Sequence, residues 1–158
     1  MKLRNWVLRR RLSLGGAVSF GFPDDDSLLV VSWNGRGLYN ILDLTRVARI
    51  PGELNGADWL RDDGTTVKGI GQFSQSWVST FGLFGGDPII RTFDGYRINF
   101  VTSGNETIGC NVSSPDDAIQ SIHIEDTSEF RAASFNPNGR FFVMLYSDVL
   151  VTYERSTD

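Results

Sequence analysis

Short apolar runs and alternating apolar and polar positions dominate the sequence, and Gly, Pro, Asn or Asp bounds each of them. Alternation with period 2 is typical of β-strands that bury one face, whereas stretches with the helical period of 3.6 are nearly absent. Residues 56–63 and residues 114–117, where Pro115 follows a serine, are compatible with a helical turn but do not alter the class. The pattern predicts an all-β fold with roughly nine or more antiparallel strands and under about 15% helix.

Two segments share one order of apolar and polar positions, which indicates an internal repeat. Residues 17–44 and residues 132–153 both begin with two small residues before Ser-Phe, and a proline-containing turn, an apolar run and an alternating run follow. A third, looser copy covers residues 89–113 and contains the turn Asp94-Gly95. Asp-Gly and Asn-Gly supply the positive φ that tight hairpins require, so each copy is expected to be a small antiparallel unit.

The middle strand of each clear copy is apolar at consecutive positions, at residues 28–31 (LLVV) and 141–145 (FFVML). Because successive side chains of a strand face opposite sides of its sheet, both faces must be covered. That is expected where small antiparallel sheets stack face to face. A two-layer sandwich leaves one face of each sheet in water and favours alternation instead.

Two short motifs resemble blades of WD40-type β-propellers. Residues 135–140, FNPNGR, are similar to the family's Phe-Ser-Pro-Asp-Gly-Arg turn, and residues 42–47, LDLTRV, resemble the corner between its third and fourth strands. Leu42 stands where the family has Trp, and the family's Gly-His dipeptide is missing. The resemblance covers residues 8–50 and 119–156, and more loosely 87–113.

This resemblance implies antiparallel propeller-like blades, up to about four for a chain of 158 residues. Residues 7–14 would then lie beside the strand at 149–153 and close the last blade as its outer strand, which protects both edges. A β-sandwich or barrel is the alternative architecture. We expect a single domain over residues 1–158, with an irregular segment at 53–86 and repeat-like units at about 15–50, 87–126 and 127–156.

Charge and hydropathy restrict the partners. Lys and Arg total 15 against 19 Asp and Glu, and five of these cations lie in the first eleven residues, so the remainder carries about −9. Such a body repels a phosphate backbone, and no apolar run reaches the roughly 20 residues that span a bilayer. We expect no nucleic-acid partner, no membrane partner and a cytoplasmic location. Arginines 9–11 become candidates for an anionic partner only if the N-terminal segment is a free arm.

No residue pattern marks catalysis or metal binding. His123 is the only histidine and no Gly-x-Ser-x-Gly elbow accompanies it, while Cys110 is the only cysteine and is expected to be buried. Asp24, Asp25 and Asp26 lack the downstream residues of a calcium loop and are expected to form a solvated turn. We expect no metal and no cofactor. The 19 acids leave a carboxylate-dependent hydrolase open as an alternative.

Aromatic residues gather in the segment that fits no blade: Trp59, Trp77, Phe81 and Phe84. Exposed aromatic residues contribute strongly to interfaces, so we expect this set to form a partner-binding patch. The resulting hypothesis is a non-catalytic protein-binding module of bacterial type, with a protein partner or self-association. An immunity-type inhibitor of a basic toxin is one version, because an acidic inhibitor complements a cationic enzyme. A carbohydrate-binding module is a further alternative.

Overall fold

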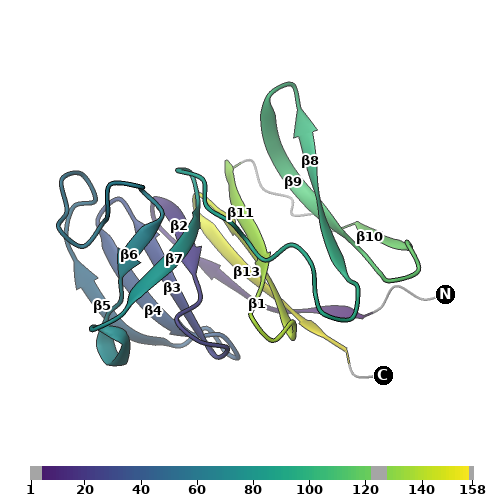
Figure 1. Ribbon diagram of the computed structural model, residues 1–158, viewed down its shortest axis with the longest axis horizontal. Coiled ribbons are helices and arrows are strands. Elements are labelled where there is room, and N and C mark those ends of the chain that lie inside the picture. Colours follow the sequence, from purple (N-terminus) through teal and green to yellow (C-terminus); the bar gives the residue numbers. More distant parts are fainter. Residues whose placement is uncertain (1–4, 122–127, 157–158) are drawn as a thin grey trace.

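The computed structural model describes residues 5–121 and 128–156, which form antiparallel β-sheets (Figure 1). These residues contain 13 strands and one short 3-10 helix, η1 (Gly71–Phe73). The expected all-β class and the expected number of strands are therefore confirmed. Residues 56–63 and 114–117 form turns and bends instead of helical turns, and Asp117 has a φ of 64°, which a right-handed helix does not accommodate.

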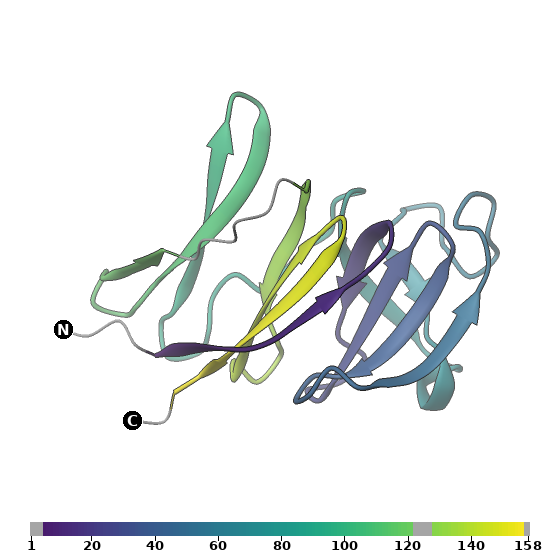
Figure 2. The same cartoon turned by 180° about the vertical axis from the view of Figure 1, so that it is seen from behind.

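The first sheet joins the two ends of the described chain. Its strand order is β1-β13-β12-β11, and its members are β1 (Trp6–Ser13), β11 (Phe130–Phe135), β12 (Phe141–Tyr146) and β13 (Val149–Arg155). β1 runs antiparallel to β13, with Trp6 opposite Arg155 and Ser13 opposite Val149. Figure 2 shows the purple β1 lying along the yellow β13. The predicted pairing of residues 7–14 with residues 149–153 is confirmed.

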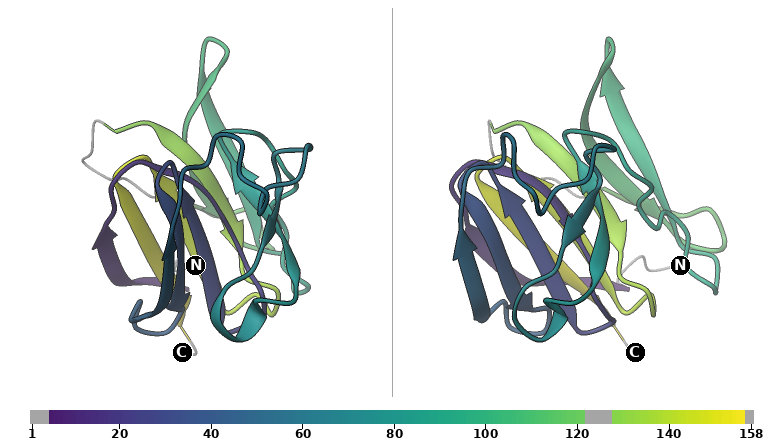
Figure 3. Two further views of the ribbon diagram at one scale, coloured as in Figure 1. Left: turned by 90° about the vertical axis from the view of Figure 1, so that its left-hand side faces the viewer. Right: turned by 60° about the vertical axis from the view of Figure 1, so that its left-hand side comes forward.

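The second sheet has six strands in the order β5-β4-β3-β2-β7-β6. Four of them follow one another in the chain: β2 (Ala17–Gly21), β3 (Ser27–Ser32), β4 (Gly35–Asn40) and β5 (Arg46–Pro51). β6 (Thr66–Lys68) and β7 (Trp77–Gly82) lie within residues 53–86, which were expected to be irregular, and β7 pairs with β2. The left view of Figure 3 shows that the sheet curls, and η1 contacts β5.

The third sheet has the order β10-β9-β8, with β8 (Arg97–Ser103), β9 (Glu106–Ser113) and β10 (Ile119–Ser121). The hairpin of β8 and β9 projects beyond its neighbours (Figure 1). Ile89 connects this region to the first sheet, because its carbonyl oxygen accepts a hydrogen bond of 2.9 Å from the Phe135 amide. A hydrogen bond of 2.9 Å joins Asn99 to Asn111 across β8 and β9.

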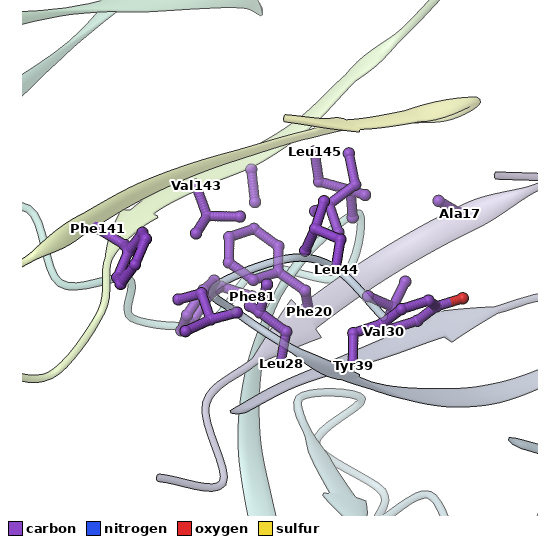
Figure 4. Close-up of a cluster of buried hydrophobic side chains, with 13 residues drawn as sticks. Ala17, Phe20, Leu28, Val30, Tyr39, Leu44, Phe81, Phe141, Val143 and Leu145 are labelled. Carbon is purple, nitrogen blue, oxygen red and sulfur yellow. The ribbon is translucent and has the colours of Figure 1, made fainter. Parts of the chain in front are cut away.

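The four-stranded sheet lies between the other two sheets (Figure 1), and its strands β11, β12 and β13 have buried residues on both faces. Figure 4 shows one side of it, where Val143 and Leu145 of β12 face Phe20 and Leu28 of the six-stranded sheet. On its other side, Phe142 and Met144 belong to the cluster that includes residues of β8 and β9. All six residues of β12 are therefore buried, which explains its unbroken apolar run.

Candidate functional site

The four aromatic residues predicted to bind a partner do not form one patch. Trp59 is half-buried and Trp77 is 40% exposed, and both line the same cavity. Phe84 is 45% exposed and contacts the Trp33 ring instead. Phe81 is only 5% exposed, so its expected place on the surface is wrong: β7 pairs with β2, and the Phe81 ring packs edge-on against Phe20 at 4.8 Å.

The cavity that contains the two tryptophans has a volume of about 400 Å³. We call it the tryptophan pocket; its lining residues come from β4 and β5, from the ends of β6 and β7, and from the loops beside them. Ligand sites often occupy such positions, between elements or in the mouths of closed sheets. Its lining residues are Arg36, Ile50, Asp58, Trp59, Lys68, Gly69, Ser74, Gln75 and Trp77.

An arginine stacks on each tryptophan ring. The Arg36 guanidinium carbon lies 4.5 Å from the centre of the Trp59 ring, and that of Arg61 lies 4.3 Å from the centre of the Trp77 ring. A cation above an indole face is attracted by the quadrupole of the ring, by about 0.5–1 kcal/mol at an exposed site. Each contact therefore favours the observed orientation of its ring.

Arg36 is a buried cation, only 7% exposed. It lies on β4 two residues before Leu38, on the face that the curl encloses, and its Nη1 donates a hydrogen bond of 2.6 Å to the Lys68 carbonyl oxygen. Its Nε–H is buried without a hydrogen-bond partner. Desolvation lowers the pKa of Arg36, and the nearby charge of Asp58 opposes this shift in part. The guanidinium remains charged, because an arginine is effectively always protonated in proteins.

Sequence reasoning found the two tryptophans of this pocket but missed Arg36, Asp58 and Lys68. A signal for Arg36 exists in the sequence: a charged residue stands between Gly35 and Gly37 in a strand whose neighbouring strand, β3, is fully apolar at its centre. A charge at such a position is rarely buried without a reason. Nothing in the sequence indicates that β4 and β6 approach each other.

A larger cleft of about 840 Å³ is lined by β11, by the overhanging β8–β9 hairpin, and by residues at the end of β7 and after it, Phe81 among them. Phe100 and Ile108 line it from the hairpin, and both are exposed. Its charged lining residues are Glu106, Glu129 and Arg131, of which Arg131 and Glu129 form an ion pair of 2.9 Å. The Arg131 Nε also donates to the Ala17 carbonyl oxygen at 3.0 Å, so this arginine links the first two sheets.

The remaining candidates for catalysis or metal binding are Cys110, the turn that contains Asp24, and His123. Cys110 is buried, and burial raises the pKa of its thiol to about 12, so it is a poor nucleophile. The Asp24 carboxylate accepts a hydrogen bond from the Asp26 amide within an exposed turn. His123 lies outside the described residues. Within residues 5–121 and 128–156, no three His, Cys, Asp or Glu side chains gather as a metal site would require.

The N-terminal arginines belong to a paired strand and not to a free arm. Arg9 Nε lies 2.6 Å from a Glu154 carboxylate oxygen, and Arg140 lies 2.6 Å from the other one. The condition under which arginines 9–11 become candidates for an anionic partner is therefore not met. No helix in the described part of the chain has the length and apolar character needed to cross a membrane.

The fold and the pocket define an all-β protein of stacked antiparallel sheets with a small aromatic and charged cavity. No protein-family model matches the sequence, and no curated protein matches it either. The likeness to WD40-type blades, the number of blades and the single-domain boundary therefore remain predictions.

Proposed function

We propose that this chain is a non-catalytic protein-binding module of bacterial type that contacts its partner through the tryptophan pocket. The observation that supports this is the pairing of Trp59 and Trp77 in one cavity, each stacked on an arginine. Trp and Arg are enriched among the few interface residues that dominate binding energy. A rigid ring also loses less conformational freedom when a partner docks, which favours affinity.

The charge of the molecule suits a cationic partner. The protein carries a formal net charge of −4, and complementary charge raises association rates and disfavours wrong partners. An immunity-type inhibitor of a basic toxin, acting in the cytoplasm, is the specific form of the proposal. Self-association through the same pocket is its second form, and it predicts a mass that rises with concentration in sedimentation experiments.

The test compares Trp77→Ala with Phe93→Ala. Trp77 is 40% exposed and lines the pocket, whereas Phe93 is fully exposed outside it. The partner is isolated from the native host, identified by mass spectrometry, and titrated against the wild type and both variants. We expect Trp77→Ala to weaken binding by about 30-fold or more, as a hot-spot residue does, and Phe93→Ala to have little effect.

If the wild type and a folded Trp77→Ala variant bind the partner with equal affinity, the pocket is not part of the interface.

The two alternative functions are tested on the same protein preparations. A carboxylate-dependent hydrolase would use the larger cleft, where Glu106 and Glu129 are the acids, and would turn over chromogenic glycosides. A carbohydrate-binding module would be retarded by soluble polysaccharides in native gels, and Trp77→Ala would abolish the retardation.

A further inference from the structure

Arg36 is a buried charge without a counter-charge in contact with it. It is 7% exposed, and no carboxylate among the described residues forms an ion pair with it. Its Nη1 is occupied by the Lys68 carbonyl oxygen, but its Nε–H has no hydrogen-bond partner. Buried charges and donors are normally satisfied, since leaving one without a partner lowers the stability of the fold. Because Arg36 lines the tryptophan pocket, a negative charge placed there would supply the missing counter-charge.

The tryptophan pocket is locally positive on a protein that is negative as a whole. Arg36 and the exposed Lys68 both line it, against a single acid, Asp58. Its polar side chains at Ser74 and Gln75 complete a mixed lining with the two indole rings. A ligand that carries one negative charge on a short carbon stem matches this combination, because the charge meets the cations and the stem meets the rings.

We propose that the tryptophan pocket takes a carboxylate group of the partner protein, presented either by an acidic side chain or by a chain terminus. The Arg36 guanidinium supplies one positive charge at the wall of the pocket, and Lys68 supplies the second. A guanidinium fork fits the planar carboxylate well. The proposal rests on the proposed function and adds the chemistry of the anchoring group.

The ligand side is tested with short peptides and NMR. The probes are acetylated Ala-Glu-Ala amide, its glutamine counterpart, acetylated Ala-Ala-Ala with a free C-terminal carboxylate, and inorganic phosphate. The readouts are the Nε–H resonance of Arg36 and the indole N–H resonances of Trp59 and Trp77. We expect saturable shifts with one or both carboxylate peptides and at least about tenfold weaker binding of the glutamine peptide, the effect of one charge-assisted hydrogen bond.

The difference in affinity between the two carboxylate peptides shows which kind of carboxylate the pocket prefers. Tighter binding of the glutamate peptide indicates an acidic side chain, and tighter binding of the free terminus indicates the end of a chain. The proposal is overturned if neither peptide shifts the Arg36 resonance, if the glutamine peptide binds equally well, or if inorganic phosphate binds more tightly than both.

Variants test the protein side. Lys68→Gln removes an exposed charge and is expected to weaken the carboxylate peptides several-fold, whereas Asp58→Asn removes the competing acid and is expected to strengthen them about two- to fivefold. The matched control is Arg49→Gln, which removes an exposed cation of β5 that does not line the pocket. Arg36→Gln is expected to abolish binding of the carboxylate peptides, and its NMR spectrum shows whether the variant is folded. Equal losses in Lys68→Gln and Arg49→Gln would mean nonspecific charge attraction and overturn the proposal.

The two proposals fail separately. If the peptides bind as expected but Trp77→Ala keeps full affinity for the native partner, the pocket is a carboxylate site and not the protein interface. If Trp77→Ala no longer binds the partner but no carboxylate peptide binds the wild type, the pocket is part of the interface and the proposal of a carboxylate anchor is wrong.

Discussion

Glu154 is a single side chain that links three segments of the first sheet. One of its carboxylate oxygens accepts from Arg9 of β1, and the other accepts from Arg140, which precedes β12. Only 8% of the residue is exposed, so its charge depends on these two cations. Desolvation raises the pKa of Glu154, but the hydrogen bonds from Arg140 and Arg9 outweigh it, and the pKa lies below its usual range.

This shift predicts a specific pH dependence of stability. A carboxyl group whose folded pKa is lowered stabilises fully above its unfolded pKa, about 4.3 for Glu, and the contribution disappears as pH falls through the folded value. We expect the free energy of unfolding of the wild type to fall more steeply than that of Glu154→Gln between about pH 5 and about pH 3. Urea titrations at several pH values measure it.

The matched control for this experiment is Glu53→Gln, which removes an exposed carboxyl group elsewhere. Its profile is expected to follow the wild type. Parallel profiles for the wild type and Glu154→Gln would contradict the prediction, because the bridge would then add no acid-sensitive stability.

At the scale of elements, the pairing of β2 with β7 depends on glycine. A Cβ atom on Gly21 would lie 2.2 Å from the Ser79 carbonyl oxygen, closer than real Cβ atoms come to backbone. Gly21 lies opposite Thr80 in the ladder, and its lack of a side chain lets the Ser79 backbone approach this closely. A side chain at this position must therefore push β7 away from β2.

We predict that Gly21→Ala lowers stability by about 1–3 kcal/mol, the range for an overpacked site. The matched control is Gly15→Ala, because no atom outside its chain neighbours lies within 4 Å of the added Cβ and Gly15 does not have a positive φ. Thermal midpoints of both variants against the wild type provide the measurement. Equal midpoints would show that β7 shifts at no cost.

Elements with a local signal could be predicted from the sequence, and those that depend on distant pairing could not. The consecutive apolar residues of β12 predict burial on both faces, and all six are buried. In β7, by contrast, the pattern of residues 77–82 does not reveal that β2 is the neighbour, and so Phe81 is core and not surface. The tryptophan pocket has the same origin, since Arg36 and Lys68 meet only through the curl of the sheet.

β1 attaches the start of the described chain to its last strand. Trp6 is 4% exposed and its ring contacts those of Tyr96, Phe135 and Phe142. The strand therefore contributes a core residue as well as a ladder of backbone hydrogen bonds. Its loss would uncover an edge of β13 and part of the second core cluster.

We predict that a chain of residues 14–158 is less stable than the full chain, and that a peptide of residues 1–13 restores stability when added separately. The peptide carries the side chain and the backbone groups that β13 and the core lack. Thermal midpoints measured at rising peptide concentration test this, since a ligand of the folded state raises the midpoint by mass action. A peptide with Trp6→Ala serves as control and is expected to restore less.

The same pairing sets an order of events during translation. β1 leaves the ribosome first, whereas β13, the strand that it pairs with, is made last. At common rates of synthesis the gap between them is on the order of ten seconds. Throughout this interval β1 is an unpaired strand, the kind of segment that recruits other chains. Charged side chains disfavour such pairing, so we expect the exposed, consecutive charges of Arg9, Arg10 and Arg11 to reduce aggregation of the nascent chain before its last strand exists.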